Sequence, residues 1–218
     1  VPLIQKEVID KATQAGKPVI IATQILDSMT DRPIPTRAEV SDIANAILDG
    51  ADALMVTGET AMGKFPEKVT QVLTRVIEET ESAINYQDYY ISRGNKHLNT
   101  AQAISHAACS VAYDQDIKIL ITMTHSGSTA RMVSRYRPAA RIIAMTPIKE
   151  ISRQLSIVWG ITPIVINEYN SSSEIQDVAN AVLSLEEILK EGEKYVITGG
   201  VPVGVPGTTN YLSVFKFA

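Results

Sequence analysis

The densest cluster of polar side chains in the sequence follows an apolar stretch and precedes a helical pattern. Its members are Thr124, His125, Ser126, Gly127, Ser128 and Thr129. Hydroxyl groups and free backbone N–H groups at a helix start can surround an anion, and the helix dipole adds roughly half a positive charge. This run therefore predicts a phosphate-binding loop, to which Arg131 and Arg135 can add full charges. It lacks the Gly-Lys-Ser/Thr triplet of a Walker A loop, and an ordinary Ser/Thr cap of a helix explains the same residues without a ligand.

A second candidate is the Gly- and Pro-rich stretch at 199–210, which ends in Gly207, Thr208, Thr209 and Asn210. Glycines allow the backbone to approach a ligand closely, and prolines restrict the loop. The hydroxyl and amide groups at its end can bind the same ligand as the first loop. The alternative is a hairpin-like connection that needs turn residues for its own geometry.

A third candidate is Thr57-Gly58-Glu59-Thr60, which also follows an apolar run. Glu59 is the only carboxylate directly at a predicted strand end in the first 90 residues. A single carboxylate is too little for a metal site or for an acid–base pair, so a capping or ion-pairing role is the simpler interpretation. The lone Cys109 excludes an internal disulfide and a multi-cysteine zinc site. The sequence thus predicts no metal ligands in this chain.

Short β-branched runs that alternate with amphipathic stretches must position these groups. The runs expected as strands lie at 19–22, 53–56, 119–122, 142–145, 163–166 and 195–197, with a last strand at 211–217. Nearly continuous apolar strands separated by helices indicate a parallel sheet that is covered on both faces. The connection at 199–210 is too short for a parallel crossover, so the last strand should be antiparallel to its neighbour.

Five of the apolar runs end in threonine at the point where a loop begins: Thr23, Thr57, Thr124, Thr146 and Thr198. In parallel α/β folds, ligands bind at the carboxyl ends of the strands, where these hydroxyl groups can reach them. Threonine also simply suits the end of a strand, where its hydroxyl can satisfy local backbone groups.

The order of these elements predicts two domains. Residues 85–99 are polar and aromatic without strand periodicity, and we place a boundary there that separates domain 1–90 from domain 91–218. In the first domain, Thr36 and Glu39 have the spacing of a capping box, which predicts that a helix begins there and ends at Gly50.

The composition excludes several classes of protein. The chain has 218 residues, of which 45% are hydrophobic and 20% charged, so it can form a core. Its net charge of −4 argues against a nucleic-acid-binding surface. No apolar stretch approaches the roughly 18 residues of a membrane span, and the cytoplasm is the expected compartment. The sequence begins at Val1 in what reads as the middle of a helix, so we expect an excerpt from a longer chain.

Several long motifs resemble the pyruvate kinase family. Residues 16–24, Gly-Lys-Pro-Val-Ile-Ile-Ala-Thr-Gln, resemble its seventh barrel strand, and residues 27–50 resemble the segment that follows. Residues 57–61, Thr-Gly-Glu-Thr-Ala, resemble its eighth-strand motif. The loop 124–129, the sequence Tyr136-Arg137-Pro138 and the Gly-Thr-Thr-Asn end at 207–210 resemble its C-terminal domain.

The resemblance implies an α/β fold in two parts. The first is a partial (β/α)8 barrel, namely its last two strands with their flanking helices. The second is a C-terminal α/β domain with a mostly parallel sheet and one antiparallel edge strand. A barrel of this type needs eight strands and roughly 250 residues, so the other strands should exist elsewhere.

The resemblance also implies an activity, the transfer of a phosphoryl group from phosphoenolpyruvate to ADP with Mg²⁺ (or Mn²⁺) and K⁺. The metal ligands of the family lie mostly on earlier strands. Thr23 matches the family's threonine beside the substrate, and Thr57 and Glu59 match the Ser and Glu of a Ser-Gly-Glu-Thr motif. The resemblance thus implies that all three are catalytic residues and that Thr23 also binds the substrate. Met62 stands where many members have lysine. Lys64 is the nearest residue that can replace this lysine in a contact with the nucleotide phosphates.

In the family, the loops at 124–129 and 199–210 bind phosphorylated effectors such as fructose 1,6-bisphosphate, sugar monophosphates or AMP. No Lys or Arg occurs between Ile161 and Leu189, where relatives that bind a bisphosphate supply a cation, so a sugar monophosphate or AMP is favoured. The family is usually homotetrameric. The rival interpretations are a stand-alone phosphometabolite sensor and a complete small phosphotransferase, which would need a second carboxylate near Glu59.

Overall fold

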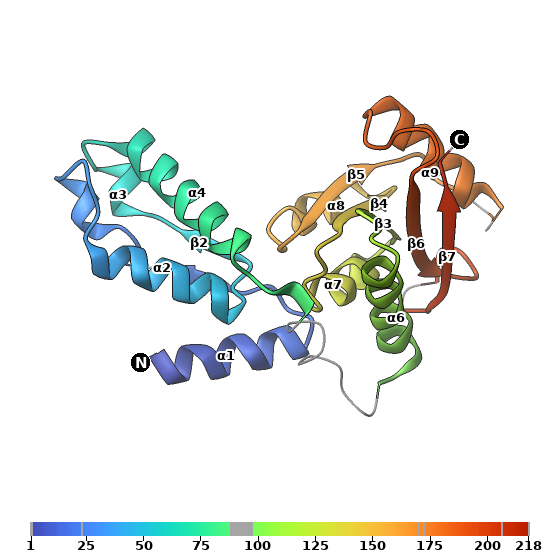
Figure 1. The fold of residues 1–218 in the computed structure, drawn as a ribbon, viewed down its shortest axis with the longest axis horizontal. Helices are drawn as coiled ribbons and strands as arrows, with labels where there is room; N and C mark the ends of the chain where they lie inside the picture. The colour runs from blue at the N-terminus through green and yellow to red at the C-terminus, as the bar shows by residue number, and fades with distance from the viewer. Residues whose placement is uncertain are drawn as a thin grey trace. The chain divides into compact units, whose positions relative to one another are not determined.

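The chain folds into two units, of residues 1–85 and 86–218, in a computed structural model that describes residues 2–22, 24–87, 98–169, 171, 173–205 and 207–217. Both units consist of parallel strands that alternate with helices along the chain (Figure 1). Among the described residues, no helix has both the length and the apolar composition that crossing a bilayer requires.

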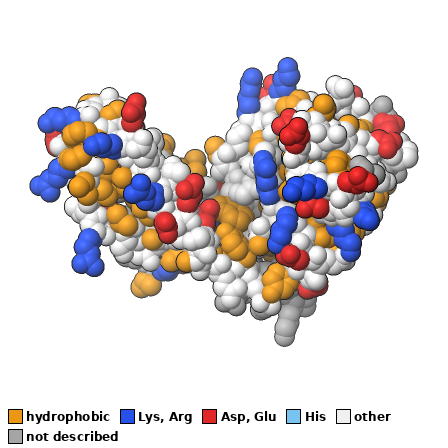
Figure 2. All heavy atoms as spheres, turned by 45° about the horizontal axis from the view of Figure 1, so that its top comes forward, with side chains coloured by type: hydrophobic (Ala, Val, Ile, Leu, Met, Phe, Trp, Pro, Cys, Tyr) orange, Lys and Arg blue, Asp and Glu red, His pale blue; other side chains and the backbone are white. Residues whose placement is uncertain are grey.

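The first unit holds two parallel strands and the helices around them. Its elements are α1 (Pro2–Gln14), β1 (Ile20–Ala22), the 3₁₀ helix η1 (Asp27–Thr30), α2 (Arg37–Asp49), β2 (Ala53–Met55), α3 (Gly58–Ala61) and α4 (Pro66–Ser82). β1 and β2 pair in parallel, with Ile20 opposite Ala53. Apolar side chains such as Leu3, Ile4 and Met55 are exposed on this unit, and Figure 2 shows hydrophobic side chains on its surface.

The capping box predicted for α2 is confirmed. The Thr36 side chain accepts a hydrogen bond from the Glu39 backbone N–H, and the Glu39 carboxylate accepts one from the Thr36 N–H at 2.7 Å. The helix ends at Gly50, which adopts a left-handed conformation with φ of 103°. Glycine suits this position because it has no Cβ that would clash in that conformation.

The second unit contains a five-stranded sheet. Its elements are α6 (Thr100–Asp114), β3 (Ile119–Met123), α7 (Ser128–Ser134), β4 (Arg141–Thr146), α8 (Lys149–Leu155), β5 (Ile161–Val165), α9 (Glu174–Leu185), β6 (Lys194–Gly200) and β7 (Thr209–Lys216). The strand order is β5-β4-β3-β6-β7, and only β7 is antiparallel to its neighbour. The predicted α/β class, with a mostly parallel sheet and one antiparallel edge strand, is therefore confirmed.

Both faces of this sheet are covered, because alternate residues of each strand point to opposite sides. On one face, Ile121 and Ile197 pack with Ala179 and Leu183 of α9. On the other face, Leu120 packs with residues of α6 and α7. The two helical layers lie on either side of the strands in Figure 1. This double burial explains the nearly continuous apolar sequence of the central strands.

The only cysteine of the chain should be inert in the folded protein. Cys109 lies on α6 with 2% of its surface exposed, and burial raises the pKa of its thiol well above the ordinary value. Because the thiolate is the reactive form, we expect no reaction with iodoacetamide at pH 8 under native conditions and complete reaction in denaturant, as measured by intact mass. Modification of the native protein would contradict this burial.

Candidate functional site

The topology of the second unit brings two of the predicted loops together. β3 lies between β4 and β6, so the chain leaves β3 toward one side of the sheet and later returns at β6 on its other side. Such a reversal of strand order creates a crevice at the carboxyl ends of the adjacent strands. Residues 124–127 form the loop that follows β3 and lead into α7, and residues 201–205 and 207–208 belong to the loop that follows β6.

A small hollow, open to solvent, lies between these two loops. It is lined by Met123, Thr124, His125, Ser126, Thr129, Tyr169, Gly200, Gly204, Val205, Gly207, Thr208 and Thr209. Seven of the nine residues predicted for the effector site therefore surround one hollow. The other two, Gly127 and Ser128, belong to the same turn but do not line it.

A buried hydrogen bond joins the first turn of α7 to the first residue of β7, next to the two loops. The hydroxyl groups of Thr129 and Thr209 lie 2.7 Å apart, although the residues are 80 positions apart in the sequence. The loop after β6 is closed by Asn210, whose side chain accepts a hydrogen bond from the Val201 N–H at 2.8 Å and donates one to the Val201 carbonyl at 2.7 Å. The loop is thus both a hairpin connection and one wall of the hollow.

The loop after β3 has a backbone geometry that requires glycine at one position. Gly127 immediately precedes α7 with φ of 77°, and a Cβ added there would lie 2.6 Å from the Arg131 guanidinium. Arg131 donates a hydrogen bond from Nη2 to the Ser126 carbonyl at 2.7 Å. The arginine therefore folds back against the loop and brings a positive charge to it, and partial burial lowers its pKa.

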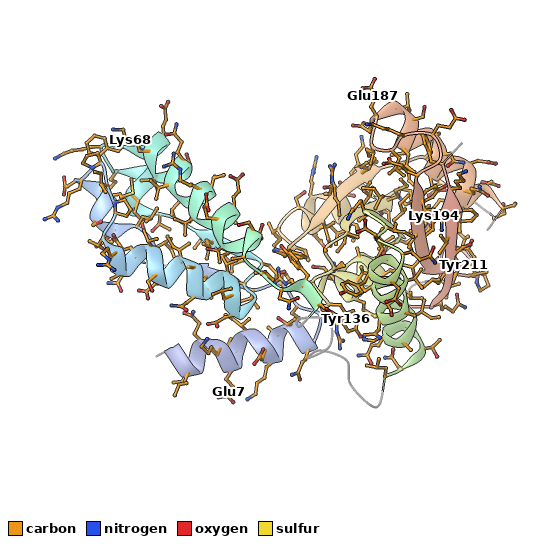
Figure 3. All side chains as sticks on the ribbon, viewed as in Figure 1. Glu7, Lys68, Tyr136, Glu187, Lys194 and Tyr211 are labelled. Carbon is orange, nitrogen blue, oxygen red and sulfur yellow. The ribbon has the colours of Figure 1, made fainter. Side chains whose placement is uncertain are left out.

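Arg135, the other arginine that the sequence suggested for the phosphate, contacts an aromatic ring. It follows α7 at the opposite end of the helix from Gly127, and its guanidinium lies 4.8 Å from the centre of the Tyr136 ring. Figure 3 labels Tyr136 at this end of α7. Arg131 thus contacts the loop after β3 through the Ser126 carbonyl, and the Arg135 guanidinium lies over the Tyr136 ring.

Two lining residues, Met123 and Tyr169, lie outside the stretches that sequence analysis singled out, and Tyr169 is the more distant in sequence. It follows β5, and its ring centre lies 5.7 Å from that of His125. Burial raises the pKa of its hydroxyl group to about 12, so the phenol keeps its proton at neutral pH. The one available signal was its position shortly after a strand of the same parallel sheet.

In the first unit, Glu59 connects the loops that follow β1 and β2. Its carboxylate accepts hydrogen bonds from the Leu26 N–H at 3.1 Å and the Thr57 N–H at 2.9 Å. Thr57 is exposed and immediately precedes α3, and Thr23 lies outside the described residues. Met62 is 82% exposed, and Lys64 forms an exposed ion pair with Asp31 at 2.8 Å.

No metal site is apparent in the described part of the chain. Within those ranges, no three His, Cys, Asp or Glu side chains are close enough to hold an ion together. Glu59 and Glu39 lie in the same region, but their oxygens accept hydrogen bonds from backbone and hydroxyl groups.

Comparison with protein families gives two matches on this chain. The model of the pyruvate kinase barrel domain matches residues 1–70, and the model of the pyruvate kinase alpha/beta domain matches residues 102–215. The two matches correspond to the first and second units of the structure. The second match alone covers more than half of the chain.

Curated relatives agree with these matches. A pyruvate kinase of Clostridium acetobutylicum is 45% identical over 215 residues, which are 98% of this chain and 46% of the relative. A pyruvate kinase of Geobacillus stearothermophilus is 43% identical over 215 residues, or 98% of this chain and 37% of the relative. The chain thus spans less than half the length of these relatives.

Solved structures give the same result. A crystal structure of a pyruvate kinase from Cryptosporidium parvum matches 99% of this chain with a TM-score of 0.88 and 36% identity, and the chain covers 43% of it. A Cryptosporidium parvum pyruvate kinase in complex with ADP matches with a TM-score of 0.82 and 38% identity. With family models on both units and relatives at 45% identity, the chain belongs to the pyruvate kinase family.

Proposed function

We propose that this chain contributes part of the active site and the effector site of an enzyme that transfers the phosphoryl group of phosphoenolpyruvate to ADP. The observation that carries the proposal is the family match over both units, together with the solved relative that binds ADP. β1 and β2 supply two strands of a (β/α)8 barrel, and further strands pair with them in the complete enzyme. Thr57 follows β2 at its carboxyl end, and we assign its hydroxyl group, and that of Thr23, which follows Ala22 in the sequence, to the substrate side of the barrel.

The described residues do not fit the metal ions that this reaction uses. Mg²⁺ takes oxygen ligands from carboxylates and substrate phosphates, and this part of the chain offers no such group of carboxylates. We therefore assign the Mg²⁺ (or Mn²⁺) and K⁺ ligands mostly to the barrel strands that precede β1. The two threonine hydroxyl groups bind or orient substrate in this proposal.

A coupled assay of pyruvate formation tests this proposal on two proteins, the complete gene product and the 218-residue chain. We expect turnover with the complete product and none above the blank with the chain alone, because the metal-binding groups are absent from it. A complete product that binds phosphorylated ligands without turnover would instead support the stand-alone sensor. Turnover by the chain alone would contradict the assignment of the metal ligands to other strands.

The hollow of the second unit is the proposed effector site. Thr124, Ser126 and Thr208 are among its lining residues, the Thr208 hydroxyl donates to the Val205 carbonyl at 2.7 Å, and Arg131 lies against the loop after β3. One phosphate group fits this set of donors, whereas a second phosphate needs another cation. The stretch from Ile161 to Leu189 supplies none, so we favour a sugar monophosphate or AMP over fructose 1,6-bisphosphate.

The proposed compartment and oligomeric state follow from the family and from the apolar side chains exposed on the first unit. We propose a cytoplasmic homotetramer in which residues 30–50 and the second unit form the contacts between subunits. Size-exclusion chromatography with light scattering of the complete product measures the mass of the assembly directly.

A further inference from the structure

We propose that Glu59 is a positioning residue, which fixes the loops after β1 and β2 relative to each other through its two carboxylate oxygens. The inference rests on the proposed function, because these loops carry Thr23 and Thr57. It differs from the direct participation in the reaction that the resemblance implies for Glu59.

The first argument is burial. Only 3% of the Glu59 surface is exposed, although its neighbour Thr57 is exposed. A buried carboxylate must have hydrogen-bond partners to be stable, and Glu59 has one on each oxygen. Oε1 accepts from the Leu26 N–H, and Oε2 accepts from the Thr57 N–H. Its burial and its backbone partners together indicate that the carboxylate holds the protein rather than a substrate.

The second argument is that the two partners belong to different loops. Leu26 follows β1 and precedes η1, whereas Thr57 follows β2 and precedes α3. The strands β1 and β2 already fix the two loops at one end, since Ala22 pairs with Met55. Glu59 adds a second connection beyond the strand ends, and it is formed by a single side chain.

Neighbouring contacts hold Glu59 itself in place. The α3 turn closes against Gly63, where an added Cβ would lie 2.1 Å from the Glu59 carbonyl oxygen. The Lys64 N–H then donates to the Thr30 carbonyl at 2.9 Å, which joins the end of this turn to η1. The backbone that carries Glu59 is therefore fastened to the loop after β1 independently of the carboxylate.

The chemistry of the connection requires a carboxylate. Burial raises the pKa of Glu59. The hydrogen bonds that its carboxylate accepts from backbone N–H groups have the larger combined effect and hold the pKa below its usual value. The group is thus ionised at neutral pH and accepts on both oxygens. A glutamine has nearly the same shape, but its amide has one oxygen that accepts and one NH₂ group that donates. In the variant, one of the two backbone N–H groups therefore faces the NH₂ group instead of an acceptor.

The test compares Glu59→Gln with Ile9→Ala in the complete gene product. Ile9 is fully buried on α1 and is outside the core cluster that contains Leu26, so its truncation destabilises the same unit without touching either loop. For Glu59→Gln at a temperature where the protein is folded, we expect kcat to fall about tenfold or more, with KM values changed less than about threefold. Amide hydrogen exchange at Leu26 and Thr57 should be about tenfold faster.

For Ile9→Ala we expect wild-type kcat and wild-type exchange at those two amides, despite a lower melting temperature. Unchanged exchange at both amides in Glu59→Gln, or an equal increase in Ile9→Ala, would overturn the positioning role. An unchanged kcat in Glu59→Gln would also overturn the positioning role when the wild-type protein itself shows turnover. A wild-type product without turnover would refute the proposed function instead, and the exchange measurement would still decide the role of Glu59.

Discussion

Replacing Ser126 with glutamate should abolish binding of a phosphorylated effector to the second unit. Ser126 lines the hollow, and its carbonyl oxygen accepts a hydrogen bond from Arg131. A carboxylate at this position repels the phosphate and offers Arg131 a competing partner. A hydrogen bond to a charged group is worth about 1.5–3 kcal/mol, so its loss together with repulsion predicts a decrease in affinity of about 100-fold or more.

Isothermal titration calorimetry of the complete gene product with AMP, a sugar monophosphate and fructose 1,6-bisphosphate measures this effect. Ser184→Glu is the matched control, because Ser184 is exposed near the end of α9 and the variant has the same net charge. We expect wild-type affinity for this control. Undiminished affinity in Ser126→Glu would show that the phosphate binds elsewhere.

Replacing Leu120 with alanine should have the largest effect on stability. Leu120 is fully buried on β3, the central strand, and it packs in the cluster formed with α6 and α7. Truncation of a buried leucine removes apolar contacts and leaves a cavity, which costs about 2–5 kcal/mol of the free energy of unfolding. The loop after β3 begins four residues later, so the same strand contributes to the hydrophobic core and supports the candidate site.

Urea unfolding followed by tryptophan fluorescence measures the loss. The chain has a single tryptophan, Trp159, which lies in the second unit and whose ring centre is 4.6 Å from the Arg137 guanidinium. Leu185→Ala is the control, since Leu185 is 83% exposed and should change the free energy of unfolding by less than about 0.5 kcal/mol. A loss below 1 kcal/mol in Leu120→Ala would contradict the tight packing of this cluster.

Local sequence signals predicted most of the elements. The capping box at Thr36 and Glu39 placed the start of α2, because both of its hydrogen bonds form within four residues. The short connection before Thr209 predicted the antiparallel last strand, since a parallel crossover needs more residues. The fold class could therefore be predicted from sequence, and so could the loops that line the hollow.

Contacts between distant residues could not be predicted in this way. The hydrogen bond between Thr129 and Thr209 depends on β3 and β6 being neighbours in the sheet. The bond from Leu26 to Glu59 likewise depends on the pairing of β1 with β2. The short helices η1 and α3 were not predicted either, since four residues are too few for a periodic apolar pattern.

The asparagine that closes the loop after β6 has a consequence for how members of this family can diverge. Because Asn210 fastens both ends of the loop through Val201, residues between them can be inserted or deleted without moving β6 or β7. The entropy of closing a loop grows slowly with its length, so such changes cost little stability. The segment between them can therefore vary in length and composition while the sheet that supports it keeps its strand pairing.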